Sequence, residues 1–123
     1  MESSNWNNVS SDYQKVFELG LSDYGKAFMQ FVTQPEMLPH GGSVLDVGCG
    51  VGKYGTCFAG LGYSVALTDI SENMIAFAEK NMAKYTTPWK TLCCDFDTAS
   101  PDAPFFRIKQ YIFRCTEYIT SAI

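Results

Sequence analysis

A glycine-rich turn directly behind a short apolar run constrains the fold of this chain most strongly. Residues 43–47 are mostly apolar and β-branched, and glycines follow at positions 48, 50 and 52. The run has the length and composition of a buried strand, and residues 53–61 have the pattern of a helix closed by Gly60 or Gly62. A strand that enters a helix through a tight glycine turn is typical of open parallel sheets in α/β proteins.

The same alternation of strand and helix continues along the chain. Residues 63–68 form a second strand pattern, Ser71 is a good N-cap for a helix through about residue 85, and residues 89–94 form a third strand pattern. The short connections predict one right-handed βαβαβ half of a Rossmann-like, doubly wound sheet. The predicted fold class is therefore α/β.

The segments on either side of this half are less regular. Apolar residues recur at helical spacing from 11 to 32, Gly20 divides this stretch into two helices, and Ser22 is a candidate N-cap for the second. Tyr13 and Tyr24 are expected to be buried, residues 1–10 to be frayed, and residues 105–119 to form a strand or a short helix. The predicted division is residues 1–42, a helical segment with a connector, and residues 43–123, a partial Rossmann-like domain.

Composition excludes several classes of protein. The chain has 123 residues, is 46% hydrophobic and carries a formal charge of −4 without any basic run, which argues against binding to nucleic acid. No stretch approaches the roughly 20 apolar residues that cross a bilayer, and the polar N-terminus does not resemble a secretory signal. Five cysteines without a CxxC pair, and one histidine, predict a reduced, metal-free, cytoplasmic protein.

An aspartate stands at the end of each predicted strand. These are Asp46, Asp69 and Asp95. Aspartate is common at strand ends, so each alone fits a purely structural role. Because the carboxyl ends of parallel strands meet at one edge, all three together predict an acidic rim that accepts hydrogen bonds from hydroxyl, amino or ammonium groups.

Several ligands compete for the glycine turn. A P-loop is excluded, because Val47 stands where its first glycine belongs and Tyr54 stands where it needs Ser or Thr. Gly50, Gly52 and Gly55 match the GxGxxG pattern of dinucleotide-binding proteins, but the match starts too late after the strand, and the aspartate in the strand would repel a pyrophosphate. A turn that serves only helix–sheet packing is a further alternative.

The run from Val44 to Gly52, VLDVGCGVG, resembles the first motif of the class I S-adenosylmethionine-dependent methyltransferases, an acid followed by x-Gly-x-Gly-x-Gly. Residues 66–75 are similar to the second strand of that family and its exit, and residues 94–96 to the place of its third acid. The resemblance covers residues 43–96 and implies S-adenosylmethionine as the cofactor.

The resemblance also implies a role for each matching residue. Asp46 would face the methionine amino group, Asp69 the ribose hydroxyls and Asp95 the adenine. The implied contacts of the loop and of the apolar lining are Gly48, Cys49, Gly50, Gly52, Ile70, Met74 and Phe96. Met74 also fits a core position on a helix face, and no residue is identified as catalytic.

The implied activity is methyl transfer to a small-molecule or protein acceptor. The resemblance accounts for three of the family's seven strands, so a truncated, non-catalytic binding or regulatory fragment is the main alternative, and a fragment of an NAD-binding oxidoreductase is the third. A partial sheet is expected to expose an edge, which predicts self-association or a partner that covers that edge.

Overall fold

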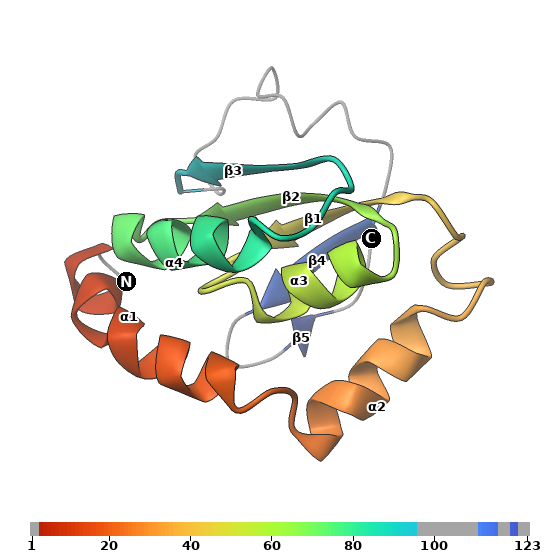
Figure 1. Ribbon diagram of the computed structural model, residues 1–123, viewed down its shortest axis with the longest axis horizontal. Coiled ribbons are helices and arrows are strands. Elements are labelled where there is room, and N and C mark those ends of the chain that lie inside the picture. Colours follow the sequence, from red (N-terminus) through yellow and green to blue (C-terminus); the bar gives the residue numbers. More distant parts are fainter. Residues whose placement is uncertain (1–2, 96–110, 116–118, 121–123) are drawn as a thin grey trace.

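The computed structural model describes residues 3–95, 111–115 and 119–120, which form four helices and a five-stranded sheet (Figure 1). The helices are α1 (Ser3–Glu18), α2 (Asp23–Val32), α3 (Lys53–Gly60) and α4 (Glu72–Met82). The strands are β1 (Ser43–Val47), β2 (Ser64–Asp69), β3 (Trp89–Cys93), β4 (Tyr111–Cys115) and β5 (Ile119–Thr120).

The sheet has the strand order β3-β2-β1-β4-β5. Strands β1 to β4 are parallel, and β5 is antiparallel to β4. The predicted βαβαβ half is confirmed, because α3 connects β1 to β2 and α4 connects β2 to β3. After β3 the chain returns to the other side of β1, so the strand order reverses between β1 and β4. Ligands of open α/β sheets bind outside the carboxyl ends of strands at such a reversal.

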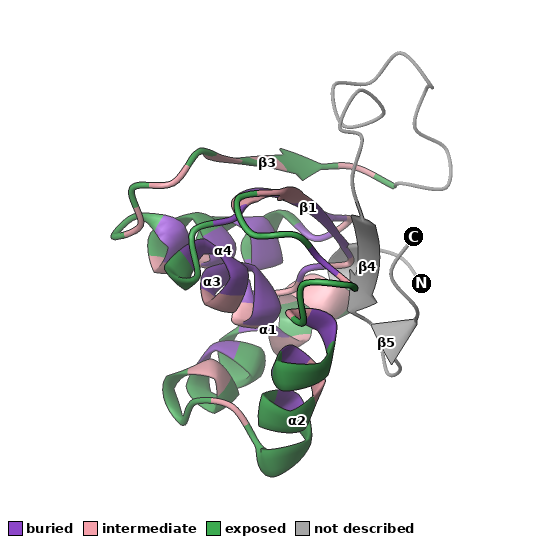
Figure 2. Cartoon of the chain, turned by 90° about the vertical axis from the view of Figure 1, so that its right-hand side faces the viewer, coloured by how far each residue is buried: buried purple, intermediate pink, exposed green. Residues whose placement is uncertain are grey.

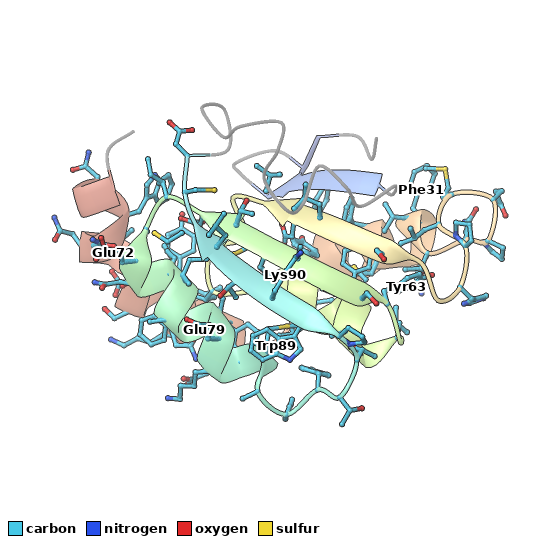
Figure 3. All side chains as sticks on the ribbon, turned by 90° about the horizontal axis from the view of Figure 1, so that it is seen from above. Phe31, Tyr63, Glu72, Glu79, Trp89 and Lys90 are labelled. Atoms are coloured by element: carbon cyan, nitrogen blue, oxygen red, sulfur yellow. The ribbon has the colours of Figure 1, made fainter. Side chains whose placement is uncertain are left out.

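The core lies between the sheet and helices α3 and α4. Figure 2 shows buried stretches of α3 and α4 in purple. Val44 and Leu67 from the sheet and Phe58 from α3 are fully buried in this core. Trp89, the first residue of β3, packs against this core, whereas the next residue, Lys90, is exposed (Figure 3). Side chains alternate between the two faces of a strand, so Trp89 and Thr91 are half-buried on one face and Lys90 and Leu92 are exposed on the other.

The connector before β1 is fixed to this core by Tyr63. Its buried hydroxyl donates a hydrogen bond of 3.1 Å to the carbonyl of Leu38, and its ring meets that of Phe58 edge to face. These contacts lie at the amino-terminal end of the sheet, opposite the edge where ligands are expected.

The two N-terminal helices lie outside α3 and α4. Gly20 has a φ of 83° and separates them as predicted, and Ser22 caps α2 by accepting a hydrogen bond from the amide of Gly25. The prediction that residues 1–10 are frayed is wrong for residues 3–10, because α1 begins at Ser3, while residues 1 and 2 lie outside the described residues. The prediction of buried tyrosines is also wrong, since Tyr13 is 47% and Tyr24 67% exposed.

Other boundaries differ by a few residues. Helix α4 ends at Met82 rather than near residue 85, and Ala83 forms its C-cap. Of the two alternatives for the tail, the structure shows a strand at 111–115. None of the described helices combines the length and the apolar composition needed to cross a membrane.

Candidate functional site at the carboxyl edge of the sheet

The three aspartates lie at successive levels along the carboxyl edge. Asp46 of β1 is paired with Leu67 of β2, and Asp69, two residues further along β2, is paired with Cys93 of β3. Asp95 follows Cys93 by two residues. Asp69 therefore lies about 7 Å further along the strand direction than Asp46, and Asp95 lies beyond the end of β3. Asp46 is fully buried, Asp69 is 9% exposed and Asp95 is exposed, so the steps run from the interior to the surface.

The glycine loop after β1 turns through three left-handed residues. Gly48, Gly50 and Gly52 have φ values of 71°, 56° and 89°, in the region that side chains disfavour. Among the described residues other than its two chain neighbours, no heavy atom lies within 4 Å of the position that a Cβ on Gly50 would take, whereas at Gly52 the backbone of Ala78 is 3.6 Å away. The loop is therefore open at Gly50 and packs closely against α4 at Gly52.

Asp69 joins the glycine loop to the start of α4. One carboxylate oxygen accepts a hydrogen bond of 2.9 Å from the amide of Gly50, and the other accepts one of 2.9 Å from the amide of Ser71. Burial raises the pKa of this carboxyl, and the amide donors of Ser71, Gly50 and Ile70 oppose that shift only in part. The acid at the end of β2 thus helps to set the shape of the loop.

Cys49 lies between the two buried acids. Its amide donates to the carbonyl of Thr68 on β2 at 2.8 Å, and its thiol contacts the carbonyl of Gly50. Burial raises the pKa of the Cys49 thiol well above its ordinary value, and the charges of Asp46 and Asp69 raise it further. The thiol therefore stays protonated and does not supply a nucleophile.

The N-terminus of α4 is fixed by a residue from α1. Ser71 caps α4 by accepting a hydrogen bond of 3.1 Å from the amide of Met74, and its hydroxyl donates to Asn7 Oδ1. The same Asn7 oxygen accepts from the amide of Asn73 at 3.2 Å. Helix α1 thus adjoins the part of α4 that follows Asp69.

A second polar contact ties α1 to the glycine loop. Gln14 and Asn81 of α4 form a reciprocal pair of amide hydrogen bonds, at 3.0 and 2.8 Å. Asn81 also donates to the carbonyl of Val51 within the loop, at 2.8 Å. The loop is therefore held from β2 by Thr68 and Asp69 and from α4 by Asn81.

The structure brings most of the predicted residues to this edge of the sheet. Besides the acids and the loop, Ile70 lies half-buried directly after β2, and Met74 is buried on α4. Burial of Met74 supports its core role. Phe96 lies outside the described residues. Among those described, no group of three or more His, Cys, Asp or Glu is arranged to hold a metal.

Sequence reasoning missed the polar residues that hold the site. Asn7, Gln14 and Asn81 stand in helices, where their side chains have no motif to mark them. The available signal was the spacing of Asn7, Ser10 and Gln14, which puts three polar side chains on one helix face. Ser10 and Gln14 on that face are buried.

Comparison with known families identifies the fold and its relatives. The family described as the methyltransferase domain matches residues 44–118, which is more than half of the chain and includes the glycine loop and the acids. This chain belongs to the methyltransferase domain family. The resemblance read from the first glycine motif is thus confirmed. No curated protein matches this methyltransferase domain significantly.

Solved structures share its fold. A TehB-like SAM-dependent methyltransferase from Corynebacterium glutamicum has a TM-score of 0.57 and 23% identity, over 80% of this chain and 50% of that chain. A complex of DhpI with SAH has a TM-score of 0.57 and 21% identity, over 82% of this chain and 47% of that chain. The Rossmann-like α/β fold is therefore confirmed, and the methyltransferase domain spans about half the length of these structures.

Proposed function

We propose that this domain binds S-adenosylmethionine at the carboxyl edge of β1, β2 and β3 and transfers its methyl group to a small-molecule or protein acceptor. The observation that carries the proposal is the carboxylate of Asp69, which bonds the amides of Gly50 and Ser71. The glycine loop and the acid at the end of β2 are thereby one unit, as a site for a single nucleoside ligand requires.

The local chemistry fits this cofactor. The loop is open at Gly50, where a side chain would obstruct a ligand, and it is flanked by the carboxylates of Asp46 and Asp69. S-adenosylmethionine carries an ammonium, a sulfonium and two ribose hydroxyls, which carboxylates attract or accept, and it has no phosphate for them to repel. A dinucleotide would place its pyrophosphate against the same acids.

Each of the proposed site residues would then contact a particular part of the cofactor. Asp69 would accept hydrogen bonds from ribose hydroxyls, Asp46 would balance the charge of the methionine amino group, and Asp95 would bond the adenine amino group. Ile70 and Met74 would line the adenine. The cofactor supplies an activated methyl group, so the chain needs mainly to orient it and to exclude water.

The share of the solved structures that this chain spans favours a second candidate function. This chain spans about half the length of the solved structures above. A chain that keeps the cofactor site without a complete acceptor site would act as a non-catalytic binding or regulatory fragment. Saturable cofactor binding together with no methyl transfer to any tested acceptor would favour this candidate.

The remaining assignments are part of the same proposal. We place the boundary between an N-terminal helical segment and the cofactor domain near residue 42, and we propose a reduced, cytoplasmic setting for the chain. The net charge of −4 supports a small-molecule or protein acceptor rather than nucleic acid.

The deciding experiment is calorimetric titration with S-adenosylhomocysteine. We expect saturable binding by the wild-type chain and at least tenfold weaker binding by Asp69→Ala, because that carboxylate both bonds the loop and would bond the ligand. Asp12→Ala, which removes an exposed acid from α1, is the matched control and should bind normally. Asp69→Asn keeps the side-chain volume and serves if Asp69→Ala fails to fold.

Two results would overturn the proposal. The first is no binding of S-adenosylhomocysteine by a wild-type chain that melts cooperatively. The second is preferential binding of NAD in a parallel titration, which would support the dinucleotide alternative.

A further inference from the structure

The carboxamide of Asn81 uses all of its polar atoms within the protein. Its Nδ2 group donates both to Val51 O and to Gln14 Oε1, each at 2.8 Å, and its Oδ1 accepts from Gln14 Nε2 at 3.0 Å. One NH2 group has two hydrogens, so these bonds exhaust its donors. This small network links α1, α4 and the glycine loop.

The role of Gln14 follows from the geometry of an amide. The oxygen and nitrogen of Asn81 could exchange places by a rotation of the side-chain amide, which would turn Oδ1 toward the carbonyl of Val51 and place two acceptors against each other. The two hydrogen bonds between Gln14 and Asn81 resist this rotation. After it, Gln14 Nε2 would face the Asn81 nitrogen, which is a donor, and Gln14 Oε1 would face the Asn81 oxygen, which is an acceptor. Gln14 is 7% exposed, so water does not readily substitute for it.

The bond to Val51 controls one peptide unit of the loop. Its carbonyl is held toward α4, while the amide of Gly52 in the same unit donates to Cys49 O at 3.1 Å. Gly52 has a φ of 89° and, as a glycine, can rotate more readily than other residues. Without Asn81, nothing else among the described hydrogen bonds restrains the carbonyl of Val51.

We infer that Asn81, oriented by Gln14, is a positioning residue that fixes the Val51–Gly52 peptide in the shape that binds the cofactor. This inference rests on the proposed function and assigns a role to two residues outside the glycine motif. It also connects the N-terminal segment to the cofactor site, through Gln14 of α1.

The test is a double-mutant cycle with two readouts. Affinity for S-adenosylhomocysteine is measured by calorimetry for the wild type, Asn81→Ala, Gln14→Ala and the double variant, well below the melting temperature of each. We expect about tenfold weaker binding for Asn81→Ala and about threefold for Gln14→Ala. The double variant should match Asn81→Ala alone, because Gln14 acts through Asn81.

The control is Tyr63→Phe. It removes a buried hydrogen bond of similar length to a backbone carbonyl, that of Leu38, at the opposite end of the sheet. It should lower the melting temperature without changing affinity. If Asn81→Ala also lowers only the melting temperature, or if the two variants add independently, the inference is overturned.

Hydrogen exchange in the unliganded chain separates this inference from the proposed function. We expect the amides of Gly50 and Gly52 to exchange at least threefold faster in Asn81→Ala and to be unchanged in Tyr63→Phe. If the wild type does not bind S-adenosylhomocysteine but this difference is seen, the proposed function fails while the positioning of the loop stands. Unchanged exchange in Asn81→Ala overturns the positioning role itself.

Discussion

Gly55 is the residue at which helix α3 comes closest to the sheet. A Cβ at this position would lie 2.5 Å from Leu67 Cδ2 and 3.3 Å from its Cγ, and Leu67 is fully buried, so its side chain would have to shift within the packed core. We expect Gly55→Ala to lower the free energy of unfolding by about 1–3 kcal/mol, measured by urea denaturation. Gly60→Ala, whose Cβ would be 3.5 Å from Tyr85, is the control and should be neutral or stabilising by up to about 1 kcal/mol; equal effects at both positions would contradict this explanation.

The carboxyl of Asp69 gives the stability of the domain a specific dependence on pH. Because burial raises its pKa, the folded chain binds the proton more tightly than the unfolded chain does. Stability should therefore fall as the pH rises from the ordinary carboxyl value, near 4, through the raised value in the fold. Chemical denaturation from pH 4 to 7 should show that the wild type loses stability relative to Asp69→Asn as the pH rises; a difference of the opposite sign would refute it.

At the scale of elements, the two serine caps differ in what surrounds them. Ser22 at the start of α2 is exposed and bonds one amide, whereas Ser71 at the start of α4 is fully buried and also donates to Asn7 of α1. We expect Ser22→Ala to cost about 1 kcal/mol or less and Ser71→Ala about 1–2 kcal/mol, because the second also leaves the Asn7 oxygen without that donor. Denaturation of both variants under one condition measures the difference, and a larger cost at Ser22 would contradict it.

The helices and strands also show which parts of the fold could be predicted from the sequence alone. The strands and helices from 43 to 93 were predictable, because a buried parallel strand, a glycine turn and a serine cap each have a local signature. Helix α1 was placed too late, since its buried residues, Ser10 and Gln14, are polar and the usual apolar periodicity does not reveal them. The bonds of Asn81 were not predictable, because they depend on how α1 packs on α4.

At the scale of the whole molecule, the position of β3 at the edge of the sheet affects the tendency of the chain to associate with other copies. β3 is the last strand in the order of the described sheet, and edge strands pair with other chains unless something prevents it. The exposed charge of Lys90 stands on this strand. We expect Lys90→Thr to associate at a lower concentration than the wild type in light scattering, since it removes an edge charge. Lys80→Thr makes the same charge change on α4 and should associate at the same concentration as the wild type. Equal association of both variants would show that net charge, and not the edge strand, controls association.

The polar inner face of α1 has a calorimetric consequence. Between residues 5 and 18, only Ser10 and Gln14 are buried, while Tyr13 and Val16 are about half exposed. Exposing apolar surface raises the heat capacity of unfolding, and exposing polar surface lowers it. Trp6, Val9 and Phe17 are half-buried. Detaching α1 should therefore absorb enthalpy, as its hydrogen bonds break, with a smaller rise in heat capacity than an entirely apolar inner face would give. The N-terminal helix would then stabilise the domain while adding little curvature to its stability curve.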